Sequence, residues 1–540
     1  MAVKAALDTL GAPDAAFVVE RPGDMAHGDY ATNAALAAAK TLQKNPREVA
    51  EALTKELEGK IEGVEKAEVA GAGFINFFLS RDVIAKEVKA AAHEEGWGSN
   101  DLYKEKKIMV EYTDPNPFKE FHIGHLMSNA IGESVARVLE GAGADVVRAN
   151  YQGDVGQHVA KAIWGKMQKP GFSWGEAYVF GSEKYEENKV EIDAINKKVY
   201  EKSDEPINKL YDEGRAQSLE HFEKIYQTLG TRFDRYFFES ETTPLGTALV
   251  QGHPELFVES DGAKVFKGED EGLHTRVFRT SQDLPTYEAK DLGLLEKKSK
   301  ENLDTSITVT ANEQNEYFKV VLAAAKHIEE LKEIAEKTKH VSHGMMRFAD
   351  SKMSSRKGNV VTGESLLAEL KEATKEKMQG RELPDADNVA EQVAVGAVKY
   401  AVLKQGSGKD IIFDPEKSLS LEGDSGPYVQ YAHTRALSLI REAEKAGITP
   451  AANDAPTVAH TLERTLLHFP DVVLRAAKEL EPHYVTTYLT ELASAFNSWY
   501  ASERLIGGAS PQYGLLLVRA VEKTLARGLY TLGIPAPEKM

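Results

Sequence analysis

The sequence predicts an α/β protein built on a doubly wound parallel sheet, with a small α+β domain before the sheet and an all-α helical bundle after it. KIMVEY at 107–112, a helical pattern over 125–140 and ADVVRANY at 144–151 follow one another as strand, helix and strand, which is the pattern of a βαβ unit. The first 100 residues combine helical patterning with a strand-like run, and residues 390–540 show amphipathic helical patterning with few strand signals.

The remaining elements follow from local patterns. Residues 31–57 have helical spacing and precede FINFFLS at 74–80, and GWGSN at 96–100 favours a chain reversal. After KIMVEY, the prolines of DPNP break the strand, and Gly141 and Gly143 can end the following helix. A doubly wound, Rossmann-like sheet binds ligands at the carboxyl ends of its strands, so we expect the site near DPNP.

The changes in patterning predict four parts. Two β-prone runs, VFRT at 277–280 and SITVTA at 306–311, are expected to return the chain to the parallel sheet. The expected parts are an N-terminal domain at 1–100, a sheet domain at 101–365 with a helical insertion at about 160–260, connecting helices at 366–400 and a helical domain at 401–540.

Composition excludes several classes of function. The 540 residues contain no cysteine, so disulfides, thiolate catalysis and cysteine-ligated zinc are all excluded. No run approaches twenty apolar residues and the N-terminus lacks a signal-peptide pattern, so we expect a cytoplasmic protein without membrane contact. The net charge of −18 disfavours a nucleic-acid partner on average, although lysine-rich stretches at 104–107 and 352–357 can form local positive surfaces.

The stretch FHIGH at 121–125 places two histidines around a glycine directly after the predicted strand. His122 and His125 lack the HExxH pattern and a nearby third ligand, which disfavours a metal site. Packing or helix capping is the ordinary alternative. At the ligand-binding edge of the sheet, the imidazoles could instead donate to phosphate oxygens while Gly124 lets the backbone approach a nucleotide. GSGKD at 406–410 does not complete a Walker A motif, because Leu403 and Asp410 occupy two required positions.

A second polar motif lies some 230 residues later, DSKMSSRKGNVV at 350–361. Alone it is an exposed basic loop, but HIGH and KMSSR in this order resemble the two signatures of class I aminoacyl-tRNA synthetases. The flanking residues resemble the arginyl-tRNA synthetase family in particular. The segments that carry this resemblance are the run from VEYTDPNPF to GDVGQHV at 110–159, GDYATNAALAAAK at 28–40, GFINFFLS at 73–80, VKYAVLKQGSGKDIIFD at 398–414, EGDSGPYVQYAHTRA at 422–436 and LYTLGIPAPEKM at 529–540.

The resemblance implies ATP-dependent ligation of L-arginine to tRNA(Arg) through an arginyl-adenylate, with release of AMP and pyrophosphate. ATP is expected with Mg²⁺ and without zinc. Two alternatives remain: another class I synthetase, and a synthetase-like tRNA-binding protein without catalysis. The absence of cysteine argues against the zinc-bearing cysteinyl type, and Glu111 with Asp291 argues for a cationic substrate.

The implied ATP site consists of His122, Gly124, His125, Lys352 and Ser354. Here the sequence departs from the class I signature, because Ser355 stands where KMSKS has its second lysine. We predict that Lys119, three residues before His122, supplies this charge, so that His122, His125, Lys119 and Lys352 are the catalytic residues. A solvent-exposed lysine in a turn is the alternative for Lys119, and Arg356 or Lys357 could also compensate.

The resemblance also implies binding residues for the two other substrates. Arginine calls for carboxylates and amide oxygens, because guanidinium is a fork of donors without an acceptor. The matching positions are Glu111, Asp114, Asn116, Tyr287, Asp291 and Gln314. For tRNA they are Phe74 and Asn76 in the N-terminal domain, and Tyr428, Tyr431, Trp499 and Tyr500 are candidates for stacking on anticodon bases, although aromatic residues at helical spacing more often belong to a core. We expect a monomer, no editing activity, and arginine activation that requires bound tRNA.

Overall fold

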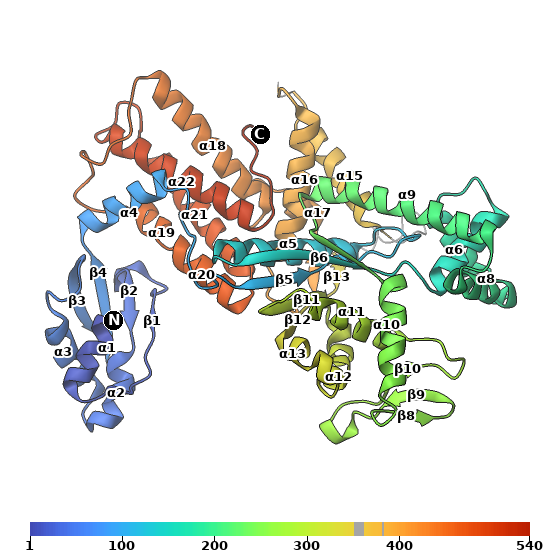
Figure 1. Ribbon diagram of the computed structural model, residues 1–540. Coiled ribbons are helices and arrows are strands. Elements are labelled where there is room, and N and C mark those ends of the chain that lie inside the picture. Colours follow the sequence, from blue (N-terminus) through green and yellow to red (C-terminus); the bar gives the residue numbers. More distant parts are fainter. Residues whose placement is uncertain (350–360, 381–382) are drawn as a thin grey trace. The chain divides into compact units, whose positions relative to one another are not determined.

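The computed structural model describes residues 1–349, 361–380 and 383–540 (Figure 1). The described chain forms two compact units, each assembled from several segments. The first unit contains residues 1–97, 435–469 and 491–525, and the second contains residues 98–434, 470–490 and 526–540. None of the helices in these described ranges has the length and apolar character needed to cross a membrane.

The N-terminal part of the first unit is an antiparallel sheet covered by helices. Its strand order is β1-β2-β4-β3, and Leu7, Ala35 and Leu53 from the helices pack with Ile75 and Phe77 of β4. The small α+β domain predicted from the sequence is therefore confirmed. The elements are α1 (Ala2–Leu10), β1 (Val19–Glu20), β2 (Tyr30–Thr32), α2 (Ala34–Leu42), α3 (Pro46–Leu57), β3 (Val64–Ala70), β4 (Phe74–Leu79) and α4 (Arg81–His93).

A five-stranded sheet with only parallel pairs forms the centre of the second unit. Its order is β12-β11-β5-β6-β7, so the chain fills one side of β5 before it crosses to the other, which confirms the doubly wound prediction. The strands are β5 (Lys107–Glu111), β6 (Asp145–Gln152), β7 (Arg235–Phe238), β11 (Thr305–Ala311) and β12 (Thr338–His343).

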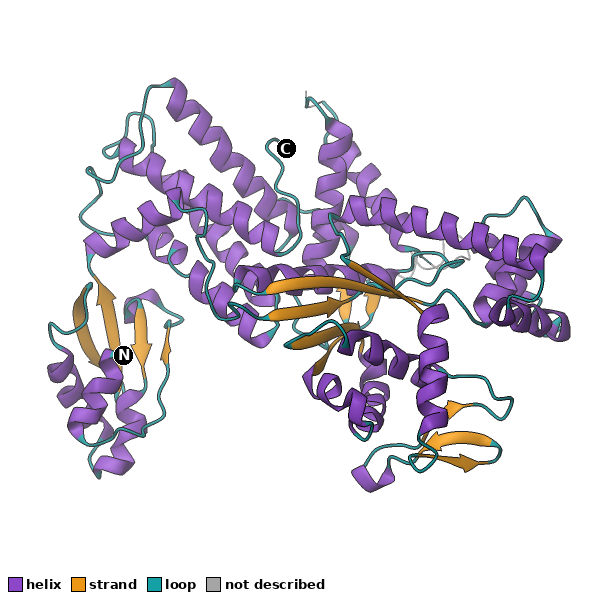
Figure 2. Ribbon diagram, viewed as in Figure 1, coloured by secondary structure: helices purple, strands orange, loops and turns teal. Residues whose placement is uncertain are grey.

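Alternate residues of β5 supply the two layers of core beside this sheet. Ile108 and Val110 pack with Val135 and Leu139 of α5 (Ile123–Gly141) on one face. Met109 points to the other face, where its core cluster draws on α11 (Tyr287–Ser299), α12 (Asn315–Lys326) and α13 (Glu329–Lys337). Figure 1 shows α5 and the α11–α13 group on opposite sides of the strands, and Figure 2 shows the sheet between these helices. The strand β5 thus lies at the middle of the unit, with its carboxyl end at Glu111.

Four helices between β6 and β7 form the insertion. They are α6 (Gln157–Gln168), α7 (Trp174–Glu183), α8 (Lys189–Glu201) and α9 (Glu205–Leu229), and α10 (Glu239–Gly252) follows β7. Phe118, from the loop after β5, joins their core and packs edge-on against Trp174 at 5.2 Å. Strand β7 lies inside the range 160–260 assigned to the insertion, but it pairs with β6 in the central sheet.

The prediction that VFRT returns to the parallel sheet is wrong. Strand β10 (Arg276–Arg279) pairs antiparallel with β9 (Ala263–Phe266), which pairs with β8 (Phe257–Ser260), so these strands form a separate sheet. The Asp261-Gly262 turn, in which both residues have positive φ, closes the tight hairpin of β8 and β9, and β10 extends that hairpin by pairing with β9. SITVTA does return to the central sheet, as β11.

The C-terminal third is almost wholly helical, as predicted. Several of its helices contribute residues to both compact units. Its elements are β13 (Met346–Phe348), α15 (Gly363–Lys377), α16 (Ala386–Leu403), β14 (Ile411–Phe413), α17 (Pro415–Ser418), α18 (Gly426–Lys445), α19 (Thr461–Leu466), α20 (Phe469–Glu479), α21 (His483–Ser502) and α22 (Pro511–Thr531).

Candidate active site

The two histidines of FHIGH cap α5 reciprocally. His122 is the N-cap, its Nδ1 accepts the backbone N–H of His125 at 3.3 Å, and the Nδ1 of His125 accepts the backbone N–H of His122 at 3.2 Å. The rings stack with centroids 3.4 Å apart. The capping alternative is therefore part of the answer, but it uses only one nitrogen of each ring. Among the described residues neither Nε2 atom has a hydrogen-bond partner.

This geometry fixes the proton on each imidazole. Desolvation and then the charge of Lys119 lower the pKa of His122, while burial, His122 and Lys119 place the pKa of His125 well below its usual value. Both rings are therefore neutral near pH 7, and an Nδ1 that accepts a backbone N–H leaves the ring proton on Nε2. The turn thus presents two neutral N–H donors.

The His122 ring leaves no room for a side chain at position 124. A Cβ at position 124 would lie 2.9 Å from Cε1 and 3.0 Å from Nδ1 of His122, so any side chain there would displace the imidazole. The segment that follows KMSSR also meets this turn. Thr362 forms an isolated β-bridge with His122, and the Gly363 N–H donates to the Phe121 carbonyl at 2.8 Å.

Lys119 is partly buried rather than fully exposed in its turn. Its ammonium lies 5.1 Å from the centre of the Tyr178 ring, and its positive charge helps to lower the pKa of both histidines. Thr113, Asp114 and Phe118 in the same loop all have positive φ, a strained conformation for residues other than glycine. Four residues named in the sequence analysis lie outside the described residues, namely Lys352, Ser354, Arg356 and Lys357.

A cavity of about 440 Å³ lies at the carboxyl end of β5, and Asp114 and Asn116 of the loop between β5 and this turn belong to its lining. Its lining contains all six side chains that the sequence assigned to arginine, although they come from distant segments. They are Glu111, Asp114, Asn116, Tyr287, Asp291 and Gln314. Tyr287 is the most accessible of them, with 62% of its surface exposed at the rim. Reasoning from sequence missed other lining residues, among them Tyr151, Glu239, Lys298, Thr308 and Tyr317.

Carboxyl groups dominate the electrostatics of the cavity. The Asp291 carboxylate accepts the Tyr317 hydroxyl at 2.7 Å, and burial together with Glu111 and Glu239 raises its pKa to about 7. Burial and Glu111 raise the pKa of Asp114 well above its usual value, although its carboxylate accepts the Tyr151 N–H at 2.7 Å. Such crowding of acids disfavours an additional anion and favours a cationic ligand.

Glu111 presents an oxygen with spare capacity. The Lys298 ammonium lies 3.0 Å from Oε2 outside hydrogen-bonding geometry, so Oε2 has no hydrogen-bond donor among the described residues. A buried carboxylate oxygen without a donor is unusual in a folded protein. It suits a guanidinium or ammonium group of a bound substrate.

Three family models match the chain in succession. They are the arginyl tRNA synthetase N terminal domain over residues 1–79, the catalytic domain of class I (R) tRNA synthetases over 87–415, and the DALR anticodon binding domain over 429–540.

The chain belongs to the arginyl-tRNA synthetase family.

Relatives and a solved structure agree with this assignment over the whole chain. An arginine–tRNA ligase of Clostridium perfringens is 31% identical and one of Clostridium botulinum 32% identical, each over 97% of this chain and 96% of the relative. The Thermus thermophilus arginyl-tRNA synthetase structure has a TM-score of 0.84 at 28% identity and covers 100% of this chain and 99% of its own. The family implied by the sequence motifs is confirmed, and another class I synthetase is not favoured.

The positions assigned to tRNA differ in how much surface they offer. Phe74 opens β4 and is 38% exposed, whereas Asn76 is 6% exposed within the same strand. Tyr428 and Tyr431 are half-buried on α18. Trp499 is 7% exposed and its ring stacks on Phe496 in the first unit, so it offers little surface to an anticodon base. Its neighbour Tyr500 is exposed instead, with the Arg435 guanidinium 5.0 Å from its ring centre.

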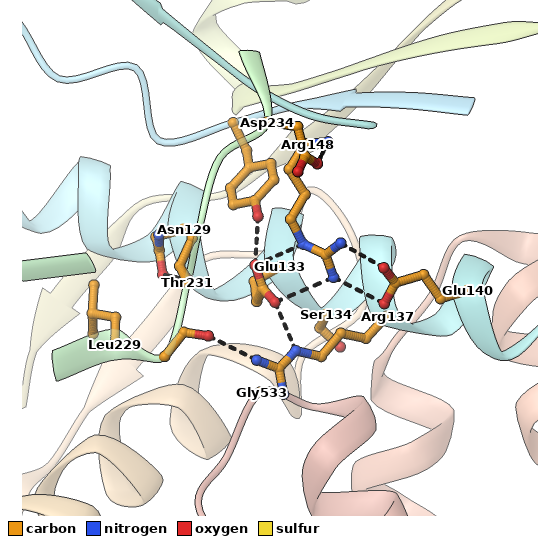
Figure 3. Close-up of polar contacts among 12 residues, drawn as sticks. Asn129, Glu133, Ser134, Arg137, Glu140, Arg148, Leu229, Thr231, Asp234 and Gly533 are labelled. Atoms are coloured by element: carbon orange, nitrogen blue, oxygen red, sulfur yellow. Dashed lines mark hydrogen bonds and ion pairs between the residues drawn. The ribbon is translucent and has the colours of Figure 1, made fainter. Parts of the chain in front are cut away.

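A buried polar network joins α5 to β6 and to the residue that follows β5 (Figure 3). Glu133 of α5 accepts the hydroxyl of Tyr112, the residue after Glu111, and pairs with Arg148 at 3.3 Å and Arg137 at 2.6 Å. Arg148 also pairs with Glu140. Burial alone would raise the pKa of Glu133, but Arg148 and Arg137 hold it below its usual value. The network connects β5, β6 and α5, which carry the site.

Proposed function

We propose that this protein joins L-arginine to tRNA(Arg) at the described cavity. In the first step the arginine carboxylate attacks the α-phosphorus of ATP, which forms arginyl-adenylate and releases pyrophosphate. In the second step a 3′-terminal hydroxyl of tRNA attacks the acyl carbon and releases AMP. The observation that carries this proposal is an acidic cavity whose lining includes Asp114 and Asn116, which belong to the loop that leads to two neutral imidazole donors.

The carboxylates would recognise the positive charges of arginine. Glu111, Asp114 and Asp291 can pair with the α-ammonium and guanidinium groups. In the described lining, Lys298 lies in ion-pair distance of Glu111, and Arg276 pairs with Glu288. Asn116 and Gln314 line the same cavity and add amide oxygens that can accept N–H donors. Tyr287 at the rim can cover the aliphatic stem.

The FHIGH turn would bind the triphosphate. The Nε2–H groups of His122 and His125 can donate to phosphate oxygens that gain negative charge in the transition state, and no change of ring protonation is needed. Lys119 and Lys352 would add positive charge. The position of Thr362 against His122 supports a role for the preceding KMSSR motif in the same site. Donors held in this way act by positioning and charge stabilisation.

Mg²⁺ would arrive with the nucleotide. Among the described residues no three His, Asp or Glu side chains are arranged to hold a metal ion, so we assign Mg²⁺ no protein ligand and derive no step through it.

The other domains would bind tRNA. Phe74 is exposed in the N-terminal domain. Tyr431 and Tyr500 lie in residues 429–540, the region matched by the anticodon-binding model, and Tyr428 precedes this region by one residue. Arginine activation that depends on tRNA, a monomeric state and a cytoplasmic location remain parts of this proposal. Light scattering of a monomer should give a mass near 59.4 kDa.

Aminoacylation of total tRNA with labelled arginine and ATP tests the proposal. The wild-type protein should form acid-precipitable arginyl-tRNA, and His125→Ala should lower kcat/KM for ATP by about 100-fold or more, as expected for loss of a donor to the transition state. His253→Ala is a matched control, because this histidine bonds only the Leu249 carbonyl outside the site. Binding of tRNA without charging would contradict the proposal.

A further inference from the structure

Lys298 is a buried lysine that neither the sequence motifs nor the reaction scheme assigns. It lies in the last turn of α11 with only 2% of its surface exposed, on the helix that carries Tyr287 and Asp291. Lysine is almost never buried to this degree without a partner. Its partner is Glu111, 3.0 Å away and itself 2% exposed.

The acids of the cavity differ in how they are compensated. Asp114 is held by the Tyr151 N–H and Asp291 by the Tyr317 hydroxyl, which are both neutral donors. Lys290, the other buried lysine of α11, pairs with Glu239 at 2.6 Å. Among the described residues, therefore, only Glu111 of the three predicted arginine-binding carboxylates lies in ion-pair distance of a buried cation.

A threonine completes the arrangement. The Lys298 ammonium donates to Thr308 Oγ1 at 3.3 Å, and the Thr308 hydroxyl donates to Glu111 Oε1 at 3.3 Å. Oε1 of Glu111 therefore accepts a hydrogen bond from Thr308, whereas Oε2 lies near the Lys298 ammonium without a hydrogen bond. The two contacts fix the rotation of the carboxylate and leave Oε2 free to accept from a ligand in the cavity.

We propose that Lys298 is a positioning residue for arginine, which holds the Glu111 carboxylate oriented so that Oε2 accepts an N–H group of the substrate. The inference rests on the proposed function of the cavity. Lys298 does not touch the reacting atoms, so it acts on arginine binding rather than on the chemical step. Its loss should raise KM for arginine and leave kcat and KM for ATP nearly unchanged.

The test is a double-mutant cycle in the aminoacylation assay. Lys298→Met should raise KM for arginine by about tenfold, the effect of losing one charge-assisted contact, and Lys298→Arg should restore most of the affinity. In a Glu111→Gln background the same Lys298→Met change should have less than about a twofold effect, because Lys298 acts through the carboxylate. Lys300→Met is the control, since Lys300 is exposed and pairs only with Glu296.

The remaining outcomes would overturn either the positioning role of Lys298 or the proposed function of the protein. An equal effect of Lys298→Met in both backgrounds, or a fall in kcat with KM unchanged, would overturn the role of Lys298. If Lys298→Met does not fold, Thr308→Val carries the test, because it removes the bridging hydroxyl and should raise KM for arginine only when Glu111 is present. Wild-type protein that charges no arginine would refute the proposed function, whereas normal charging with a silent Lys298→Met would refute this inference alone.

Discussion

Asp291→Asn should stabilise the protein while it damages arginine binding. The Asp291 carboxyl has its pKa raised from 3.8 to about 7 by burial, Glu111 and Glu239. Each pKa unit corresponds to about 1.4 kcal/mol, so ionisation of this group costs the folded state up to about 4 kcal/mol above pH 7. Solvent in the cavity screens part of this, and we expect a gain of about 2–4 kcal/mol for the variant. Asparagine keeps an oxygen that can accept the Tyr317 hydroxyl.

The sign of the pH dependence follows from linkage. A carboxyl whose pKa is raised in the folded state binds its proton more tightly there, so wild-type stability falls as the pH rises from 3.8 to about 7 and is then constant. Asp291→Asn lacks this loss. Its advantage should therefore be small at pH 4, intermediate at pH 5 and full at pH 8.

Scanning calorimetry of both proteins without ligands measures this difference. The Tm of Asp291→Asn should exceed that of wild type by a few degrees at pH 8 and by less at pH 5, while KM for arginine rises about 100-fold or more through loss of a charged partner. Asp304→Asn provides a control of opposite sign, because the Lys107 N–H and Lys106 lower the pKa of that exposed carboxyl. A variant of Asp291 that is less stable than wild type at pH 8 would refute the electrostatic argument.

Three further predictions concern the FHIGH turn and the network behind it. Gly124→Ala should lower kcat/KM for ATP by about 100-fold, because the added Cβ displaces the His122 ring. Gly96→Ala is the control and should have no effect, since a Cβ at position 96 meets open space. Equal kcat/KM values for the two variants would contradict the role of Gly124. The pKa values of His122 and His125 are lowered, so kcat/KM for ATP at saturating arginine should stay constant as the pH falls from 8 to 6.5 and decline only below pH 6.5. A decline in kcat/KM that begins above pH 6.5 would contradict the lowered pKa values. Glu133→Gln should lower the free energy of unfolding by about 3–5 kcal/mol, since it leaves Arg148 and Arg137 without their shared counter-ion. Urea unfolding measures this loss. Glu140→Gln is the comparison and should cost less, because Glu140 is half-exposed.

The fold and much of the site could be predicted because their signals are local. The strand–turn–helix pattern at 107–140 predicted β5 and α5, and with them the position of Glu111 and Asp114 at the end of β5. The six arginine positions came from the family resemblance, and the structure brings all of them to the same cavity.

The features missed by sequence reasoning depend on tertiary contacts. Lys298 stands seven residues after Asp291 on the same helix, beyond the buried Leu294 and Leu295, which is a weak signal for a buried lysine. The Glu133 network joins Arg148 of β6 to α5, and no local pattern reveals it. Trp499 is core rather than exposed for a similar reason, because α21 buries one face and the pattern alone does not say which neighbour remains outside.

The most direct test of the acidic cavity is a comparison of L-arginine with L-citrulline in the aminoacylation assay. Citrulline has nearly the same shape but carries a neutral urea group in place of guanidinium, so it lacks the charge that Glu111, Asp114 and Asp291 would bind. We predict a kcat/KM for citrulline lower by about 1,000-fold or more, since a site built to pair with a charged group leaves its own groups unpaired without it. Charging of citrulline at a rate comparable to that of arginine would contradict the account.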